Sequence, residues 1–334
     1  MHALPEYDWR PLIDSHGRRH DYLRISLTDR CNFRCLYCMP AEGVEWRDRA
    51  EILSLEEIER LAKVFVRLGV RKIRLTGGEP TVRRGFMDLL LALHKAHPSI
   101  KSFLTTNGSS LREFAEPLRE AGLSGINISL DSLRRDRFAE ITRRDVLPQV
   151  VEGIKSTIAA GISTKINVVV MPGVNDDELG DFVEFVRDRD AQVRFIEFMP
   201  FAGNLWKPER VFGYADMRRV LDADFNLQPI IGHPSDVAKE FSISGFKGTI
   251  GFVTSVTDSF CSGCNRIRLT ADGHVKTCLF LPQRTSLRDL MRAGASDSEI
   301  ATAIRADLDT KWAGHPPMDN WKQLDQLSMV QIGG

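Results

Sequence analysis

One stretch near the start of the chain constrains both its fold and its chemistry, and it reads Cys31-Asn32-Phe33-Arg34-Cys35-Leu36-Tyr37-Cys38. A strand-like run over residues 22–28 precedes it, which places the three thiols in a loop at the end of a strand. Thiolates are soft ligands that suit iron–sulfur clusters or zinc. Three cysteines supply one ligand fewer than a four-iron cluster or a structural zinc ion requires. By spacing alone, a cluster with one open iron and a zinc ion with a distant fourth ligand are equally compatible with this loop.

The first 200 residues alternate between strand-like and helix-like segments. Strands are predicted at residues 22–28, 72–76, 101–106, 125–130, 165–170 and 193–199, and helices at 55–68, 86–97, 111–121, 134–142, 148–160 and 177–189. Six strand-then-helix units with short connections predict a parallel sheet with right-handed crossovers. Several of these strands have one apolar and one polar face, whereas parallel strands covered on both faces are apolar throughout. The pattern therefore predicts an α/β fold, a partial (β/α)6 TIM-type barrel around a polar lumen.

Beyond residue 200 the alternation ends. A helix is predicted at residues 214–225, strands at 241–243, 248–256, 265–270 and 275–279, and further helices at 286–293 and 296–308. We therefore divide the chain into an N-terminal extension (1–20), the barrel (21–200) and a C-terminal α+β domain (201–334). That last domain carries a second group of thiols, Cys261, Cys264 and Cys278, and ends in Gly333-Gly334.

Composition narrows the class of protein. Of the 334 residues, 43% are hydrophobic and 27% are charged, an ordinary mix for a chain with a sizeable core. Basic and acidic residues number 45 each, so the overall charge favours neither nucleic acid nor a membrane surface as a partner. Residues 1–20 lack the apolar core of a signal peptide, and no apolar run reaches the length of a membrane span. Together with clustered cysteines, this predicts a soluble, cytoplasmic protein with two metal sites.

Positive side chains gather on the predicted polar strand faces: Arg24, Lys72, Arg74, Lys165, Arg194, Arg266 and Arg268. Singly, each such residue is most often a solvated surface charge. Together in one lumen they would be costly to bury without an anionic partner. Guanidinium groups match phosphate geometry, so a polyphosphate ligand is the simplest hypothesis.

Two further motifs bear on the chemistry. Gly77-Gly78-Glu79-Pro80 follows a predicted strand at the end where parallel barrels carry their active sites, and Glu79 is available to accept a hydrogen bond from an amine. The second group of thiols has the spacing Cys-x2-Cys-x13-Cys. It has two interpretations, a zinc ribbon completed by His274 or a second iron–sulfur cluster with an open iron.

These motifs resemble those of a known superfamily. The spacing Cys-x3-Cys-x2-Cys with Tyr37 before the third cysteine resembles the signature of radical S-adenosylmethionine enzymes, and Gly77-Gly78-Glu79-Pro80 resembles their methionine-binding motif. Residues 28–35, residues 261–270 and the Gly-Gly end resemble one family within it, the GTP 3′,8-cyclases of molybdenum cofactor biosynthesis. The resemblance extends over residues 22–334.

The resemblance implies two 4Fe–4S clusters and S-adenosyl-L-methionine as cofactors. The first cluster would be held by Cys31, Cys35 and Cys38, with its open iron binding S-adenosylmethionine, and the second by Cys261, Cys264 and Cys278 next to the guanine of GTP. Implied contacts to S-adenosylmethionine come from Tyr37, Gly78, Ser129 and Met199. Implied contacts to GTP come from Arg24, Arg74, Thr105, Lys165, Arg266, Ile267 and Arg268, of which Arg266 and Arg268 are the expected catalytic residues.

The resemblance also implies a reaction. A 5′-deoxyadenosyl radical would remove the ribose 3′ hydrogen of GTP, and C3′ would attack C8 to give (8S)-3′,8-cyclo-7,8-dihydroguanosine 5′-triphosphate, with 5′-deoxyadenosine and methionine as co-products. The expected partners are GTP, an external electron donor, the next enzyme of the molybdopterin pathway and a second copy of the chain, and the Gly-Gly end is expected to enter the active site. Two alternatives stay open here, a radical enzyme that modifies peptides or RNA and a non-catalytic zinc scaffold.

Overall fold

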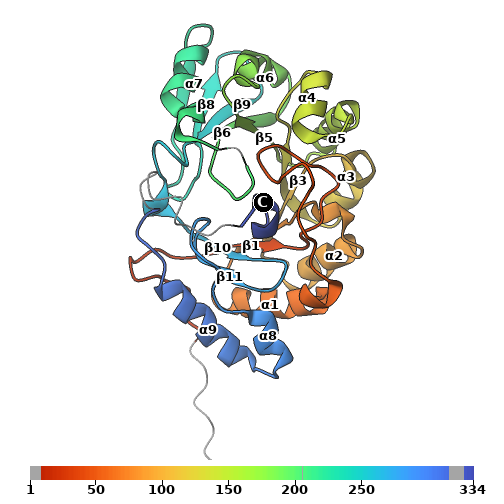
Figure 1. Ribbon diagram of the computed structural model, residues 1–334, viewed down its shortest axis with the longest axis vertical. Helices are drawn as coiled ribbons and strands as arrows, with labels where there is room; N and C mark the ends of the chain where they lie inside the picture. Colours follow the sequence, from red (N-terminus) through yellow and green to blue (C-terminus); the bar gives the residue numbers. More distant parts are fainter. Residues whose placement is uncertain (1–8, 205, 316–326) are drawn as a thin grey trace, which may run out of the picture.

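The computed structural model describes residues 9–204, 206–315 and 327–334. Its strands form one 11-stranded sheet in the order β11-β10-β1-β2-β3-β4-β5-β6-β9-β8-β7. The run from β10 to β9 is parallel throughout, and β11, β8 and β7 join the two edges in antiparallel orientation. Figure 1 shows the strands curving around a central space, with helices α1 to α6 outside them. The sheet is thus mostly parallel, as predicted, and its curvature is that of a partial barrel.

The repeated strand–helix units correspond closely to the predicted ones. The strands are β1 (Tyr22–Ser26), β2 (Lys72–Thr76), β3 (Lys101–Thr106), β4 (Leu123–Ser129), β5 (Thr164–Val170) and β6 (Ala191–Glu197). The helices between and after them are α1 (Leu55–Arg67), α2 (Phe86–Ala96), α3 (Leu111–Glu120), α4 (Arg135–Thr142), α5 (Leu147–Ala159) and α6 (Leu179–Phe185). Ser54 and Glu57 form the capping box that begins α1. The helix predicted at 177–189 is shorter at both ends: a 3-10 turn, Asp176–Glu178, takes its first residues, and α6 ends at Phe185.

The C-terminal third contributes more to the barrel than the sequence predicts. Its elements are α7 (Tyr214–Leu221), β7 (Leu227–Ile230), β8 (Lys239–Ile243), β9 (Thr249–Val253), β10 (Arg266–Leu269), β11 (Val275–Lys276), α8 (Leu287–Arg292), α9 (Asp297–Asp309) and α10 (Met329–Ile332). β9 pairs in parallel with β6, and β10 pairs in parallel with β1. Both ends of the six-strand sheet are therefore extended by strands from beyond residue 200, while the division into domains stays a prediction. β7 and α10 were not predicted.

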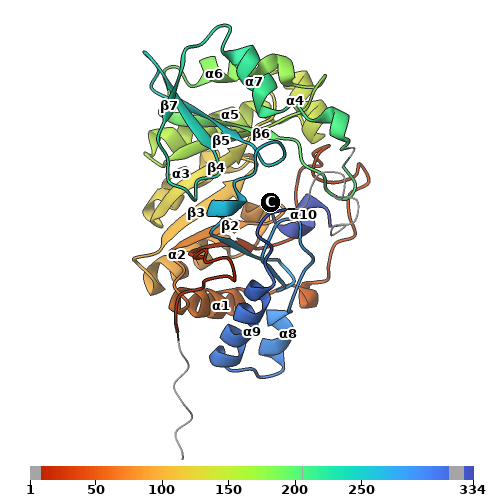
Figure 2. The same cartoon turned by 90° about the vertical axis from the view of Figure 1, so that its left-hand side faces the viewer.

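The alternation of the strands is reflected in their packing. Leu23, Ile25 and Leu27 are fully buried in the core between sheet and helices, on the face opposite Arg24. The register sets Arg268, Arg24 and Arg74 side by side across β10, β1 and β2. Three guanidinium groups thus form one row on the inner face of the sheet. Figure 2 shows α8 and α9 below the barrel beside α1, where Arg60 pairs with Asp297 at 3.0 Å. No helix in the described ranges is long and apolar enough to cross a membrane.

Candidate active site

A cavity inside the ring of strands brings together most of the predicted site residues. Its wall includes Cys31, Cys35, Tyr37, Cys38, Gly78, Ser129 and Met199 from the predicted S-adenosylmethionine site, and Arg24, Thr105, Arg266 and Arg268 from the predicted GTP site. Gly334 also lies on this wall, so the chain's last residues do reach the cavity. Figure 1 shows the C-terminus at the centre of the ring.

Helix α4 and the residues after it hold the cysteine loop from outside. The backbone N–H of Arg34 donates to the Thr142 carbonyl at 3.0 Å. Arg143 donates to the Arg34 carbonyl at 2.7 Å, and Arg144 donates to the Asn32 carbonyl at 2.8 Å. These contacts fix the loop backbone without using the thiols. The sulfur atoms are therefore left for ligands in the cavity.

The environment of the first three thiols fits an iron–sulfur cluster. Burial raises the pKa of Cys31 to about 11, and it raises the pKa of Cys35 and of Cys38 further in the same direction. Thiolates in this place thus need a cationic partner such as the irons of a cluster. Among the residues that the structure describes, no three Cys, His, Asp or Glu side chains are grouped as ligands of one metal ion are. Three buried thiols on one cavity wall match the ligands that a 4Fe–4S cluster with one open iron requires.

The loop Gly77-Gly78-Glu79-Pro80 lies against the cysteine loop. The N–H of Gly78 donates to the Thr28 carbonyl at 2.7 Å, and that of Glu79 donates to the Arg30 carbonyl at 2.8 Å. A Cβ on Gly78 would lie 2.3 Å from the Arg30 carbonyl oxygen, so only glycine fits at this position. The glycines therefore let the backbone of this loop pack closely against residues 28–30. They also leave the loop backbone accessible from the cavity.

Glu79 has a structural role that was not predicted from the sequence. Its buried carboxylate accepts hydrogen bonds from the hydroxyls of Thr81 and Thr106 and from the N–H of Asn107, each at 2.7 Å. Within the described residues it is not part of the cavity wall. The oxygens of Glu79 accept hydrogen bonds from protein donors and so join the loops after β2 and β3, while its contact with a ligand amine stays a prediction.

We expect Glu79→Gln to destabilise the fold by about 2 kcal/mol. The NH2 group of the new amide would face a hydrogen-bond donor that now donates to the carboxylate, and two donors cannot form a hydrogen bond. The free energy of unfolding in urea measures this change. Glu113→Gln, on the exposed surface of α3, is the matched control and should leave stability unchanged. Equal stability of both variants would contradict the structural role of Glu79.

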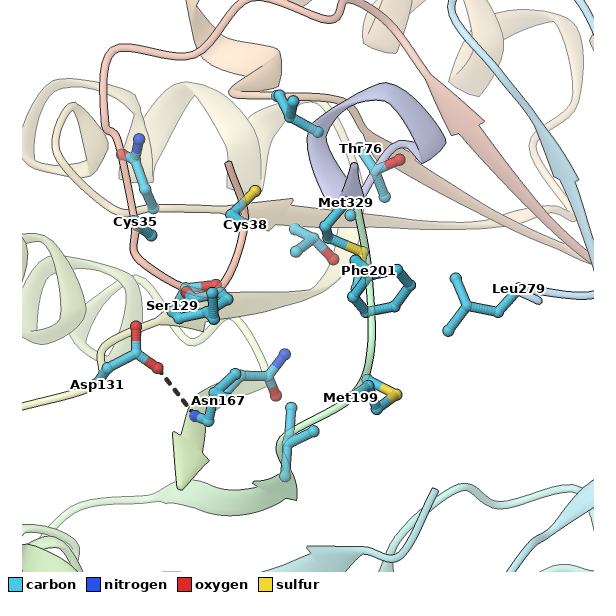
Figure 3. A pocket seen from close by; sticks show the side chains of 18 of the residues that line it. Cys35, Cys38, Thr76, Ser129, Asp131, Asn167, Met199, Phe201, Leu279 and Met329 are labelled. Atoms are coloured by element: carbon cyan, nitrogen blue, oxygen red, sulfur yellow. Dashed lines mark hydrogen bonds between the residues drawn. The ribbon is translucent and has the colours of Figure 1, made fainter. Parts of the chain in front are cut away.

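A polar wall lies next to the cysteine loop. Figure 3 shows Ser129, Asp131 and Asn167 on one side of the cavity, with Met199 and Phe201 across from them. Asp131 accepts a hydrogen bond from the N–H of Val169 at 2.9 Å, and burial raises the pKa of Asp131 to about 7. Of these polar residues, only Ser129 was predicted to be a site residue. Asp131 and Asn167 could have been found from their places at the carboxyl ends of β4 and β5.

Three arginines make the other part of the cavity strongly positive. Burial, with a contribution from the charge of Arg268, lowers the pKa of Arg24 well below its ordinary value. Burial and the charge of Arg266 lower the pKa of Arg268 to about 10. Among the described residues, the buried Nε of Arg24 has no hydrogen-bond partner. Closely spaced guanidinium groups that are incompletely paired suit an anionic ligand.

The last two residues of the sequence, here called the tail, lie among these arginines. The Gly334 carbonyl oxygen accepts hydrogen bonds from Arg24 and, at 3.3 Å, from Arg268. The Gly333 carbonyl accepts one from the Thr76 hydroxyl at 2.7 Å. The tail thus contacts the same arginines that were predicted to bind GTP.

Three predicted GTP residues lie outside the wall of this cavity as the described residues form it. Arg74 is not among the described residues of the wall, and its guanidinium donates to the Leu104 carbonyl at 2.7 Å. Ile267 is 1% exposed in the hydrophobic core. Lys165 lines a different cavity and shares the carboxylate of Glu240 with Arg194, at 3.6 and 3.1 Å. The predicted contacts of these residues with GTP stay predictions.

The second group of thiols lines an adjoining cavity. Cys261, Cys264 and Cys278 share this cavity with Arg266 and Arg268, which also line the first one. Burial alone would raise the pKa of Cys264, but the charges of Arg266 and Lys311 outweigh it and lower that pKa to about 6. A stable thiolate is what an iron–sulfur cluster requires of its ligand.

His274 does not complete this group of thiols. Its Nδ1 lies 3.1 Å from the carboxylate of Asp272, and in the described part of the chain it is not on the wall of this cavity. The interpretation as a zinc ribbon completed by His274 is therefore wrong. The histidine on the wall is His315, which the sequence analysis did not consider.

Comparison with known families agrees with this geometry. The family model "Radical SAM superfamily" matches residues 25–186, and the model "Molybdenum Cofactor Synthesis C" matches residues 191–317. The crystal structure of Streptococcus suis SuiB bound to S-adenosylmethionine is similar to this chain with a TM-score of 0.58 and 17% identity, over 87% of this chain and 69% of that one. At that identity the likeness shows the fold alone.

Curated relatives are much more similar in sequence. "GTP 3',8-cyclase, mitochondrial" of Arabidopsis thaliana is 46% identical over 97% of this chain and 83% of its own length. "GTP 3',8-cyclase" of Petrotoga mobilis is 40% identical over 97% of this chain and its entire length. "Molybdenum cofactor biosynthesis protein 1" of Drosophila melanogaster is 49% identical over 91% of this chain, which spans about half (54%) of that longer relative. From the two thiol groups, the fold and these relatives, we conclude that the chain belongs to the GTP 3′,8-cyclase family of the radical S-adenosylmethionine superfamily.

Proposed function

We propose that this protein converts GTP to (8S)-3′,8-cyclo-7,8-dihydroguanosine 5′-triphosphate, the first step of molybdopterin formation. One observation carries the proposal: two groups of three thiols open into adjoining cavities that share Arg266 and Arg268. The proposed radical source and the proposed second cluster would thus both border the arginines that make up the anion site. The relatives named GTP 3',8-cyclase support the choice of GTP.

The chain's own residues would bind, orient and shield the reactants. Cys31, Cys35 and Cys38 would hold one 4Fe–4S cluster, and Tyr37, Gly78, Ser129 and Met199 would contact S-adenosylmethionine. Cys261, Cys264 and Cys278 would hold the second cluster. When bound and reduced, the cofactors supply a 5′-deoxyadenosyl radical that takes the ribose 3′ hydrogen, while an external reductant supplies one electron for this cleavage and one, with a proton, to complete the product.

The arginines would hold the substrate in place. Arg24, Arg266 and Arg268 would neutralise and orient GTP, with Arg266 and Arg268 nearest the second cluster and therefore nearest the base that reacts. Arg74, Thr105, Lys165 and Ile267 complete the proposed GTP contacts. Burial and the neighbouring positive charges lower the pKa of Arg24 and Arg268. A bound anion would stabilise the charged form of both arginines and so offset this effect.

An anaerobic assay tests the proposal. Reconstituted protein, reduced with dithionite and given GTP and S-adenosylmethionine, should release 5′-deoxyadenosine, methionine and the cyclised nucleotide, all three quantified by mass spectrometry. If 5′-deoxyadenosine forms only with a peptide or an RNA, the substrate is wrong. If the metal is zinc without iron–sulfur absorbance, the protein is a scaffold.

The biological setting follows from the same proposal. We place the reaction in the cytoplasm and propose that the chain acts as a homodimer that passes its product to the next enzyme of the pathway. We also propose that residues 21–200 and 201–334 act as the barrel and cluster-bearing domains. The Arabidopsis relative is named mitochondrial.

A further inference from the structure

Lys311 is a buried cation for which the proposed reaction has no role. It is 4% exposed, and its ammonium group donates to three acceptors: the sulfur of Cys264 at 3.4 Å, the Arg266 carbonyl at 2.9 Å and the Thr277 carbonyl at 2.6 Å. An ammonium group carries three N–H bonds, so these contacts use all of them. The side chain is thus held in one orientation, with its charge at a cysteine sulfur.

The three acceptors belong to the segments that carry the second group of thiols. Cys264 is one of these thiols, Arg266 begins β10 two residues later, and Thr277 immediately precedes Cys278. One ammonium group therefore ties the Cys264 side of the site to the Cys278 side. This contact constrains the distance between two of the three thiols.

The N-terminal segment holds Lys311 in place from behind. The Nε2 of His16 lies 3.0 Å from the Lys311 carbonyl oxygen. Arg18 donates to the carbonyls of Cys261 at 2.8 Å and of Ala313 at 2.7 Å, and its own guanidinium is fixed by Asp14 at 2.7 Å. Residues 14–18, which had no predicted role, thus connect the backbone of Lys311 to the backbone of Cys261.

We propose that Lys311 is a positioning residue for the second cluster, whose sulfur ligand it hydrogen-bonds and whose reduction potential it raises. The inference rests on the proposed presence of that cluster at Cys261, Cys264 and Cys278. A one-electron reduction adds negative charge to a cluster, and hydrogen bonds and positive charge at its sulfurs stabilise that state. In the described residues, Lys311 lines neither cavity, so it acts through Cys264 and not on the substrate.

The test uses the full-length chain with Cys31, Cys35 and Cys38 replaced by serine, so that all cluster signals come from the second site. In this background, Lys311→Met keeps the length of the side chain and removes its charge and donors. We expect Lys311→Met to make the reduction potential of the second cluster more negative. The potential is measured by a dithionite titration that is monitored by electron paramagnetic resonance. Iron loss to a chelator should be about 10-fold faster, because residues that support ligands typically contribute that much to metal retention.

Two further variants separate a charge effect from a purely structural one. Lys311→Arg restores a positive charge. The reduction potential of its second cluster should lie between that of the Lys311→Met variant and that of the protein with Lys311. Lys155→Met removes a half-exposed lysine of α5 that pairs with Glu152 at 3.5 Å, and it should change neither quantity. An unchanged potential in Lys311→Met overturns the proposal, even if iron is lost faster. If the serine background binds no iron at all, the second cluster itself is absent and the proposed function fails with it.

Discussion

We expect Cys35→Ser to abolish the release of 5′-deoxyadenosine, a loss of at least about 1,000-fold, because S-adenosylmethionine cannot be cleaved without the first cluster. Serine offers a hard oxygen in place of a soft thiolate, and the loop has no fourth cysteine to replace it. Cys35 lies between the other two thiols of the loop and lines the same cavity. Liquid chromatography of the quenched reaction measures the nucleoside, with and without GTP.

The iron content distinguishes this result from misfolding. Cys35→Ser should retain about half of the iron of the unaltered protein, since the thiols of the second site are untouched. Cys261→Ser provides the converse control: it should still release 5′-deoxyadenosine slowly but form no cyclised product. Full nucleoside release from Cys35→Ser would show that the first loop is not the radical site.

Gly333→Ala should lower the rate of cyclisation by about 100-fold, since displacing a reacting group by about 1 Å can cost this much. A Cβ at Gly333 would lie 2.4 Å from the Cβ of Ser26, and the glycine has φ of 93°, a conformation that alanine rarely adopts. The displaced tail would lose its hydrogen bonds to Arg24 and Arg268. These two arginines would then no longer be held in the orientation in which they are proposed to bind GTP. The measurement is the cyclised nucleotide formed per unit of iron.

Gly294→Ala is a matched control for backbone strain. Gly294 has φ of 90°, and a Cβ added there would have no heavy atom within 4 Å, so this variant introduces the same strain without the clash. It should retain cyclisation activity. Ser26→Gly combined with Gly333→Ala should recover part of the activity, because it removes the contacting Cβ. If Gly333→Ala is fully active with the tail displaced, the tail has no part in turnover.

Much of the fold was predictable because its signals are local. The period-two pattern of strands such as Tyr22–Ser26 predicts a sheet with one polar face. The alternation of strands with helices predicts that the strands are parallel. The pairing of β10 with β1, and of β9 with β6, was not predictable, because partners from distant parts of the chain leave no local pattern. The predicted separate C-terminal domain thus has strands in the barrel's own sheet.

The site shows the same division between local and distant information. Cysteine spacing identified both groups of thiols, and strand faces identified Arg24 and Arg268 as inward cations. Contacts that depend on tertiary structure were missed, such as those of Lys311 with Cys264 and of Lys165 with Glu240. Sequence alone could not show that the carboxylate of Glu240, on β8, lies 3.6 Å from the ammonium group of Lys165.

The parallel pairing of β1 with β10 has a kinetic consequence. This contact joins Tyr22 to Arg266, which are far apart in the sequence, and contacts of that kind form late because closing a long loop costs chain entropy. The local β–α units can form earlier. We therefore expect β1 to pair with β10 late in folding, after the local units that surround the first cysteine loop have formed.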